Sequence, residues 1–508
     1  MGVVQLCKSV TKSISRAVSG DPEVRGLVAH HPRFFGFVRR RLNPETGFGV
    51  QVTIGALLAV YWAALFVGIV EDLVGRQPLL QTDLRIINLV PLLRTAAGSH
   101  VMLVVSALGQ WQVVVTGMMV VAIVLVGYRR WHDLAALGVS VAGGELLVWW
   151  AKHLIARPRP PLVAALVTES GFSFPSGHSF VAVSFYGLVT YFVVRAAPGW
   201  WRKVTTVIGG ASLIGAVGFS RVYLGAHWPS DVLAGFTAGL AWLTTIITIL
   251  EVWRKYHRDL PIVDPGRRRL WWWGLAAAGV WILHLAFYVN YHPLLPPSAV
   301  TPPVIRVNAD AIPQRLFATL PRFSESIIGS LMEPINIIVV GSLPQLRETL
   351  TAAGWYRTDP ITFGSLWSLL RTSLFNQPYP QAPGNPAFWD AQPNVFAYER
   401  PTAAGTVRER HHIHFWQTPF AVADGREVWL ATAHFDTTIN LRSSRLLPSH
   451  TIDPAVDVER DAFTQDMQRT GTVASVGSYP LVKPSLGKNL SGGQFFTDGK
   501  VSVIFLQP

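Results

Sequence analysis

The sequence predicts an all-α polytopic membrane domain, a six-helix bundle plus a seventh helix, followed by a soluble mixed α/β domain. Half of the 508 residues are hydrophobic and only 14% are charged, and the mean hydropathy is +0.32. This balance is too apolar for an ordinary soluble protein. Short basic runs border the apolar segments, as is typical of membrane topology signals. After about residue 290 the composition changes to that of a soluble chain.

The composition of residues 1–46 predicts a basic cytoplasmic segment. The stretch carries scattered Lys and Arg residues and lacks the continuous apolar core of a signal peptide. Its sequence VVQLCKSVTKSISRAV fits either a basic amphipathic helix on anionic lipid or a loosely ordered tail. Cys7 is the single cysteine of the chain, which excludes an intramolecular disulfide and a cysteine-rich zinc site.

Seven apolar runs follow, and each is a candidate membrane-spanning helix. They cover about Gly49 to Val70, Val101 to Tyr128, Leu134 to Ala151, Phe180 to Val194, Val204 to Phe219, Val232 to Val252 and Leu270 to Val289. The fourth and fifth runs are shorter than the roughly 20 residues that a spanning helix needs, so flanking residues must extend them. We assign residues 47–255 to the bundle, and residues 256–292 to a basic loop and the seventh helix.

The basic residues predict the orientation in the membrane. With the N-terminus in the cytoplasm, the inside loops receive most of them: Arg39, Arg40, Arg41, Arg129, Arg130, Arg195, Arg202, Lys203, Arg254, Lys255, Arg258, Arg267, Arg268 and Arg269. We therefore expect a multi-pass protein of the cell inner membrane, with the C-terminal domain on the periplasmic or outer face. Because these basic runs border apolar segments, the net charge of +13 indicates the lipid bilayer, and not nucleic acid, as the partner.

Three polar clusters interrupt the apolar sequence, and this orientation places all of them on the outer face. They are Lys152 with Arg159, then Pro175-Ser176-Gly177-His178, then Ser220-Arg221 with His227 and Asp231. Charged and histidine side chains are costly within a bilayer. Their recurrence at the ends of apolar helices therefore indicates a functional site.

The first two clusters suit an anion. Arg pairs bidentately with phosphate and Lys acts as a point charge, although snorkelling basic residues at a helix end form the same pattern. The second cluster begins a helix, where free N–H groups and the positive dipole end favour an anion. There Gly177 lets the backbone approach a phosphate, the Ser176 hydroxyl can donate, and His178 can protonate a departing oxygen. A helix-capping turn beside an incidental histidine is the alternative.

The third cluster places a histidine and a carboxylate one helical turn apart. If the sixth helix begins near Pro229, Ser230 caps it and Asp231 faces His227. A carboxylate on one imidazole nitrogen fixes the tautomer and raises the basicity of the other nitrogen, as a nucleophile that attacks phosphorus requires. Arg221 adds another cation. An exposed His–Asp pair on a loop is the alternative.

Together the patterns K-x6-RP, PSGH and SR-x5-H-x3-D resemble the type 2 phosphatidic acid phosphatase superfamily, over roughly Gly49 to Val252. The resemblance implies that His227 attacks phosphorus to give a phosphohistidine, that Asp231 orients it, and that His178 protonates the leaving group. It also implies that the phosphoryl oxygens are held by Lys152, Arg159, Ser176, Gly177 and Arg221, with no metal or other cofactor. The spacing from Lys152 selects Arg159, and not Arg157, as the arginine of the motif.

The composition of the C-terminal part indicates a separate domain. Five prolines between residues 293 and 303 mark a linker region, which we assign to residues 293–340 before a soluble domain at residues 341–508. INIIVVGS followed by LPQLRETLTAAGW predicts a strand and then a helix with Ser342 as its N-cap, and HHIHFWQT and EVWLATAHFD predict strands. The segment from about Gly341 to Thr470 resembles the LssY C-terminal domain. That resemblance implies no established activity, so the partner of this domain stays open.

The same domain concentrates potential metal ligands: His411, His412, His414, His434, Asp436, His450 and Asp453. On a strand, His412 and His414 project to the same face, and two more ligands would complete a metal site. Solvated or hydrogen-bonded histidines are the alternative.

As a whole, the sequence predicts an integral membrane lipid phosphatase that hydrolyses a phosphomonoester or a pyrophosphate of a lipid. Phosphatidic acid, phosphatidylglycerol phosphate and undecaprenyl pyrophosphate all fit a pocket that recognises the phosphoryl group. One rival is a lipid phosphotransferase that uses the same histidine. The other is a membrane anchor that presents a C-terminal binding domain.

Overall fold

The computed structural model describes residue 22 and residues 29–42, 49–75, 78–161, 165–256, 267–292, 294–295, 303–375, 377–402, 409–440, 449–488 and 494–507. The amphipathic segment considered at residues 3–18 lies outside the described residues, as do four of the five linker prolines.

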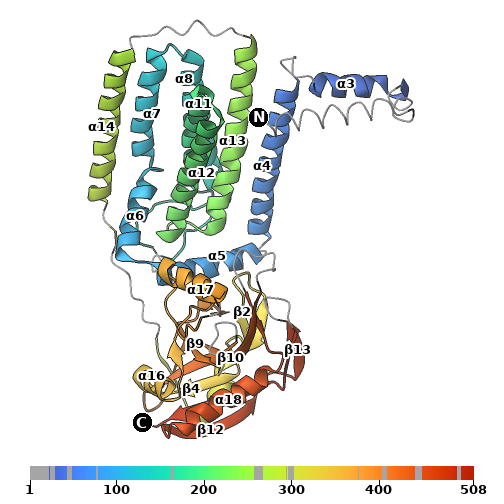
Figure 1. The fold of residues 1–508 in the computed structure, drawn as a ribbon, viewed down its shortest axis with the longest axis vertical. Coiled ribbons are helices and arrows are strands. Elements are labelled where there is room, and N and C mark those ends of the chain that lie inside the picture. Colours follow the sequence, from blue (N-terminus) through green and yellow to red (C-terminus); the bar gives the residue numbers. More distant parts are fainter. Residues whose placement is uncertain are drawn as a thin grey trace.

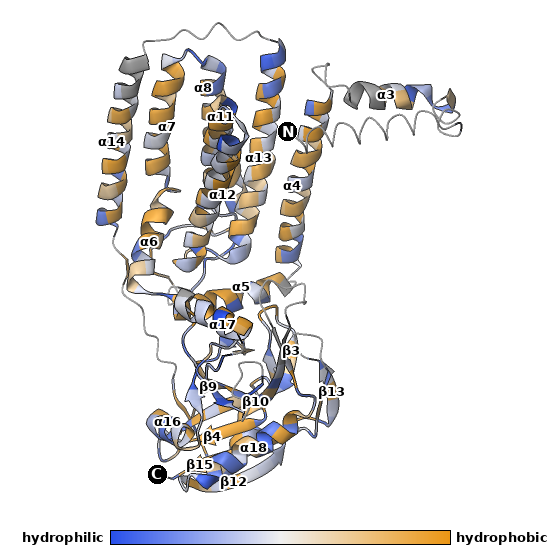
Figure 2. Ribbon diagram, in the orientation of Figure 1, coloured by the Kyte–Doolittle hydropathy of each residue, from blue (hydrophilic) through white to orange (hydrophobic). Residues whose placement is uncertain are grey.

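The apolar helices form one bundle, and a sheet-rich domain lies beyond one of its ends (Figure 1). The bundle contains α4 (Val50–Val74), α6 (Ala96–Ala107), α7 (Trp111–Gly127), α8 (Trp131–Gly138), α9 (Gly144–Ile155), α10 (Gly177–Val181), α11 (Leu188–Ala196), α12 (Trp200–Tyr223), α13 (Pro229–Tyr256) and α14 (Arg267–Tyr291). Within the described ranges, six helices are long and apolar enough to cross a membrane, or seven if the bent pair α6–α7 is one span. Figure 2 shows hydrophobic residues along these helices. The chain is therefore a multi-pass membrane protein.

The second predicted run, Val101 to Tyr128, is not one straight helix. It is divided into α6 and α7, whose axes differ by 55°. Gly109 lies in the break, and a Cβ atom there would come within 2.9 Å of the His178 ring and 2.8 Å of Val217. The break therefore accommodates the close approach of this turn to His178. The continuous apolar composition of the run concealed it.

Two other spans contain a π-helical turn and stay continuous. Segment η2 (Val139–Gly143) joins α8 to α9, and η4 (Ala182–Gly187) joins α10 to α11. The Ser140 hydroxyl, in η2, donates to the carbonyl of Ser184, in η4, at 2.9 Å. The fourth span thus runs from Gly177 to Ala196, and flanking residues supply the length that its apolar run lacks.

Helix α5 (Pro78–Leu89) and the short η1 (Val90–Leu93) connect the bundle to the second domain. In Figure 1, α5 lies between the end of the bundle and the sheet, whereas α3 (Pro32–Leu42) lies near the opposite end of α4. The Arg85 guanidinium pairs with Glu325 of the C-terminal domain at 2.5 Å. Asn88 donates to the carbonyl of Ala391 at 3.0 Å. The segment between the first two apolar runs therefore contains a helix that contacts the C-terminal domain.

The C-terminal domain is built on a nine-stranded mixed sheet with the order β12-β15-β4-β10-β9-β8-β5, in which β1 also pairs with β9 and β11 with β10. Its strands are β1 (Ile305–Val307), β4 (Ile337–Val340), β5 (Tyr356–Arg357), β8 (Phe396–Pro401), β9 (Arg410–Val422), β10 (Glu427–Asn440), β11 (Ser449–Ile452), β12 (Val473–Pro480) and β15 (Lys500–Leu506). A four-stranded sheet contains β2 (Phe323–Glu325), β3 (Leu331–Pro334), β6 (Phe388–Trp389) and β7 (Gln392–Pro393), and β13 (Ser485–Lys488) pairs with β14 (Gln494–Thr497). The domain is mixed α/β, as expected.

Different cores cover the two faces of the large sheet. Helices α16 (Leu343–Ala352) and α18 (Val456–Arg469) pack Leu350 and Phe463 on one face, against Phe415 and Trp429. Helix α15 (Ile312–Leu316) and strand β6 cover the other face, near Trp416. Helix α17 (Phe363–Phe375) completes the domain. Neighbouring residues of β9 alternate between these faces, as a strand requires.

The structured C-terminal part begins earlier than residue 341. Strand β1 pairs with β9 in parallel, and β4, which ends at residue 340, lies between β15 and β10. The boundary drawn from the sequence places both strands in the linker. The strand β4 is predicted from INIIVVGS, whereas β1, with three residues, carries too little periodicity to be recognised. The N-cap predicted at Ser342 is confirmed, and with Gln345 it forms a capping box.

A tight contact between α13 and the N-cap of α10 gives a first prediction. A Cβ atom on Gly235 would lie 2.6 Å from the Ser176 carbonyl oxygen, so Gly235→Ala should lower the free energy of unfolding by about 1–3 kcal/mol. Thermal unfolding in detergent measures this loss. Gly209→Ala is the matched control, because nothing lies within 4 Å of its Cβ position. Equal melting temperatures for the two variants would contradict the tight packing.

Candidate active site

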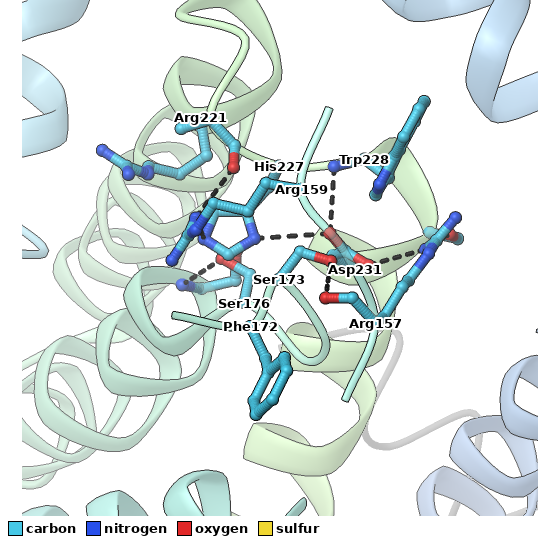
Figure 3. A network of polar contacts seen from close by, with 12 residues as sticks. Arg157, Arg159, Phe172, Ser173, Ser176, Arg221, His227, Trp228 and Asp231 are labelled. Carbon is cyan, nitrogen blue, oxygen red and sulfur yellow. Dashed lines mark hydrogen bonds and ion pairs between the residues drawn. The ribbon is translucent and has the colours of Figure 1, made fainter. Parts of the chain in front are cut away.

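The three polar clusters come together at the end of the bundle that faces α5. The C-terminal ends of α9 and α12 and the N-terminal ends of α10 and α13 carry them. Contacts join these ends, since Arg159 lies 3.3 Å from His227 and the Ser176 backbone N–H donates to the Asp231 carbonyl at 3.0 Å. Figure 3 shows the resulting network of polar contacts. Residues separated by up to about 80 positions in the sequence thus share one site.

His227 and Asp231 form its centre. The His227 Nδ1 atom lies 3.4 Å from Asp231 Oδ2, which also accepts a hydrogen bond from the Trp228 backbone at 3.0 Å. The Nε2 atom lies 3.3 Å from a terminal guanidinium nitrogen of Arg159. Because a guanidinium can only donate, Nε2 accepts and the proton is on Nδ1, facing the carboxylate. The lone pair of Nε2 is therefore on the side of the cations.

Arg157 holds the carboxylate in place. Its guanidinium contacts Asp231 Oδ1 at 2.6 Å, the Ser230 hydroxyl at 2.7 Å and Asp83 Oδ2 at 2.7 Å. Asp83, on α5, also accepts from the backbone N–H of Ser230 at 2.9 Å. All four side chains are buried. The N-terminus of α13 is therefore capped by a carboxylate from a different helix, and not by Ser230 as the sequence predicted.

The first cluster contributes two cations. After the left-handed Ala156 ends α9, Arg159 donates to the carbonyls of Gly171 and Ser170 at 3.1 Å and of Ala226 at 2.9 Å. Lys152 donates to the Phe172 carbonyl at 2.8 Å. Neither forms an ion pair with a described residue. Their positive charges are therefore oriented by neutral partners and are not neutralised.

The second cluster begins α10. Ser176 is its N-cap and accepts from the Ser179 backbone N–H at 3.4 Å and from the Ser179 hydroxyl at 3.0 Å. A Cβ atom on Gly177 would meet only Val148, at 3.6 Å, so this glycine is not required by crowding. The Nε2 atom of His178 is buried and has no hydrogen-bond partner among the described residues.

The third cluster adds Arg221 and a residue that the sequence did not reveal. Arg221 is buried and pairs with Glu169, and it also donates to the Ser106 hydroxyl. His178, Arg221 and Glu169 line a cavity of about 460 Å³. The unpartnered nitrogen of His178 therefore borders a space large enough for a phosphate group.

The pKa shifts of His227 and Glu169, which lie in loops between the spans, agree with this arrangement of charges. Burial and then the charges of Arg221, Arg159 and Lys152 hold the pKa of His227 well below its ordinary value of 6.5. Burial opposes ionisation of Glu169, but Arg221 and Arg159 keep the pKa of Glu169 below its usual value. At neutral pH His227 is therefore a neutral base among cations, and an anion at the site would be stabilised.

These features define a class: a multi-pass membrane protein with a buried histidine–carboxylate pair surrounded by cations at one end of its bundle. Residues 133–256 match the family model of the PAP2 superfamily, and residues 317–501 match that of the LssY C-terminus. The chain contains a PAP2 superfamily domain and an LssY C-terminal domain.

Named relatives resemble the membrane domain. Phosphatidylglycerophosphatase B of Bacillus subtilis is 42% identical over 115 residues, which cover 22% of this chain and 56% of that protein. Undecaprenyl-diphosphatase of Sulfolobus acidocaldarius is 29% identical over 119 residues, 22% of this chain and 50% of that protein. The chain thus spans about half the length of these curated relatives. The crystal structure of a transmembrane PAP2 type phosphatidylglycerolphosphate phosphatase from Bacillus subtilis matches with 29% identity and a TM-score of 0.35, covering 41% of this chain and 98% of that one.

The sequence predicts that the motif residues come together, but it does not reveal three of their partners. Asp83 lies between two apolar runs, Arg157 belongs to a second Arg-Pro pair beside the motif, and Glu169 follows no motif spacing. The one signal in the sequence is that Asp83 is the single carboxylate of a largely apolar stretch. A buried carboxylate needs a cation nearby, so its presence indicates a partner elsewhere in the chain.

The Arg157 bridge gives a second prediction. Arg157→Gln leaves the buried Asp83 and Asp231 without a shared counter-charge, so the free energy of unfolding should fall by about 3–5 kcal/mol. Asp83→Asn in the same chain should recover part of the loss. Thermal unfolding of the two single variants and the double variant gives the coupling energy.

The control is Arg130→Gln, which alters an arginine that is 40% exposed and pairs with Asp133 at 3.4 Å. Its effect should stay below about 1 kcal/mol. A loss for Arg157→Gln no greater than this control would refute the role given to the bridge.

Proposed function

We propose that this protein is a metal-independent lipid phosphatase that hydrolyses a phosphomonoester or a pyrophosphate of a lipid at the outer face of the membrane. The observation that carries the proposal is the orientation of His227, with Nδ1 toward Asp231 and Nε2 toward Arg159. A buried neutral imidazole whose Nε2 lone pair faces cations is arranged to attack an anionic phosphoryl group. The named relatives act, by their names, on lipid phosphates and diphosphates.

In the proposed reaction, His227 Nε2 attacks phosphorus and the bond from phosphorus to the leaving oxygen breaks. His178 donates a proton to that oxygen, and Asp231 stabilises the imidazolium through Nδ1–H. A water molecule, deprotonated by His178, then attacks the phosphohistidine and releases phosphate and free His227. Lys152, Arg159, Arg221 and the N-terminus of α10 at Ser176 and Gly177 hold the phosphoryl oxygens through both steps.

The position of the site in the bundle supports a lipid substrate. Trp149 and Trp150 are exposed one turn before Lys152, and Trp200 and Trp201 are exposed at the other end of the bundle. Exposed tryptophans mark the two membrane–water interfaces. A head group could therefore reach the cations while its acyl or prenyl chains stay in the bilayer. The distribution of basic residues among the loops supports an orientation in which this end of the bundle lies outside.

A direct assay tests the proposal. Purified protein in detergent should release phosphate from phosphatidic acid, phosphatidylglycerol phosphate or undecaprenyl pyrophosphate, and the preferred lipid would identify the substrate. His227→Ala should abolish both release and the phosphohistidine, whereas His178→Ala should slow release by about 10²–10⁴-fold, the usual worth of general acid–base catalysis. Chelators should leave release unchanged.

The controls separate the rivals. Transfer of phosphate to an added alcohol instead of water would favour a phosphotransferase. Release that persists in His227→Ala would remove the proposed nucleophile. If no lipid phosphate is processed while the protein stays folded, the anchor interpretation would replace the enzyme.

The pH profile gives a separate prediction. Because burial and the neighbouring cations lower the pKa of His227, the acid limb of kcat/KM should lie below pH 6.5. Arg159→Gln removes one cation, so the pKa of His227 should rise and the acid limb should move to higher pH. Initial rates from about pH 4 to 8 with one substrate compare the limbs, and titration of the substrate cancels between enzymes. An unshifted limb would contradict this electrostatic role.

A further inference from the structure

Three histidines converge on the face of the large sheet that is turned away from α18. His412 and His414 are two residues apart on β9, and His434 on β10 lies directly opposite His412 in the strand register. The ring centroids are 4.3 Å apart for His412 and His414, 5.3 Å for His412 and His434, and 5.7 Å for His414 and His434. One nitrogen from each ring lies within 4.8 Å of one nitrogen from each of the others.

Each of these rings has a buried nitrogen without a hydrogen-bond partner in the described part of the chain. The atoms are His412 Nε2, His414 Nδ1 and His434 Nδ1. Buried polar atoms in proteins are nearly always hydrogen-bonded, and each exception calls for an explanation such as an ion. One metal ion would explain all three unpartnered nitrogens, because a neutral imidazole nitrogen is the commonest protein ligand for a metal.

The carboxylate near the other ring nitrogens of His412 and His434 also fits a metal site. Asp436 Oδ2 lies 3.5 Å from His412 Nδ1, and Asp436 Oδ1 lies 3.6 Å from His434 Nε2. Arg410 donates to Asp436 at 3.2 Å and to Glu399 at 2.8 Å, which fixes both carboxylates. Metal-binding histidines commonly turn the other ring nitrogen toward a carboxylate, which sets the tautomer and the ring orientation.

A glycine leaves room beside the first of these nitrogens. A Cβ atom on Gly384 would lie 2.9 Å from His412 Nε2 and 2.4 Å from the neighbouring Cε1. Gly384 and His414 also line a cavity of about 590 Å³, whose polar walls include Arg357, Asn385 and Asn394. The side of the cluster that faces Gly384 is therefore connected to a space that admits a further ligand.

We propose that His412 Nε2, His414 Nδ1 and His434 Nδ1 bind one divalent zinc-class ion whose fourth coordination position faces this cavity. Three protein ligands and an open position are typical of catalytic zinc sites, whereas structural sites have four protein ligands. The ion would take a water molecule, or an oxygen of a ligand in the cavity, as its fourth ligand. Zinc–nitrogen bonds of about 2.0–2.1 Å place the three nitrogens roughly 3.3 Å apart, so the rings close slightly around the ion. The site shares no residue with the phosphatase site.

Metal analysis of the full chain tests the proposal. Protein purified in detergent without a histidine tag is stripped with a chelator, incubated with Zn²⁺, freed of unbound metal and analysed by mass spectrometry. We expect about one zinc per chain and a loss to background in H412Q/H414Q. Co²⁺ in place of Zn²⁺ should give the visible absorption of a tetrahedral site. G384A should weaken zinc binding at least tenfold with all three histidines retained, since its Cβ crowds His412.

His411→Gln is the matched control, because His411 belongs to the same strand but contacts Glu459 of α18 at 2.8 Å on the opposite face. It should keep the zinc. The proposal fails if the wild-type chain binds no zinc, if H412Q/H414Q retains it, or if H411Q loses it as completely as the double variant. Circular dichroism of each variant checks folding, and G384A decides the case if H412Q/H414Q does not fold.

Discussion

The membrane domain depends on the burial of two carboxylates, Asp83 and Asp231, beside a single guanidinium. Taking a carboxylate out of water costs several kcal/mol unless a cation and hydrogen bonds replace the lost hydration. Arg157 supplies the cation to both groups, and Ser230 and the Trp228 backbone supply further hydrogen bonds. Because both carboxylates must contact the same guanidinium, α5, the segment after α9 and the start of α13 are fixed relative to one another. The same requirement uses Arg157 as the counter-ion, so that Arg159 and Lys152, which bond to backbone carbonyls, keep their charges for an anion.

Helix α5 extends the same constraint to the second domain. Asp83 and Arg85 are two residues apart, and about 200° of rotation separates them on a helix. One face of α5 therefore supports the histidine–carboxylate pair through Asp83, while another holds the C-terminal domain through the pair between Arg85 and Glu325. The C-terminal domain meets the bundle at the end where the three clusters lie (Figure 1). The two domains are thus joined by a helix that is itself part of the support of the site.

The sequence predicted the elements that carry strong local signals. The apolar runs located the six spans of the described residues, or seven if the bent pair α6–α7 is one span. The positions of Lys152, His178 and His227 at helix ends predicted that they lie on one side of the bundle. The sequence does not reveal the 55° bend at Gly109, because hydropathy carries no information on helix direction. Strands β1 to β3 were also missed, because a strand of three or four residues has almost no pattern, whereas β4 was predicted from INIIVVGS. The partners Asp83 and Glu169 could not be found because an ion pair between distant segments leaves no spacing in the chain. Local sequence patterns therefore predicted where the motif residues lie. Their ion-pair partners come from distant segments and depend on tertiary packing.

The two histidine centres show how the surrounding charge decides what a buried imidazole can do. His227 is buried and lies near Arg221, Arg159 and Lys152, so protonation is unfavourable, the Nε2 lone pair is retained, and the charge that the site lacks is negative. The rings of His412, His414 and His434 lie together beside Asp436, and each has a buried nitrogen without a hydrogen-bond partner among the described residues. With neutral rings this second centre therefore presents lone pairs that a metal ion could accept. The first environment favours an anionic phosphoryl group and the second favours a metal cation, although both present the same side chain.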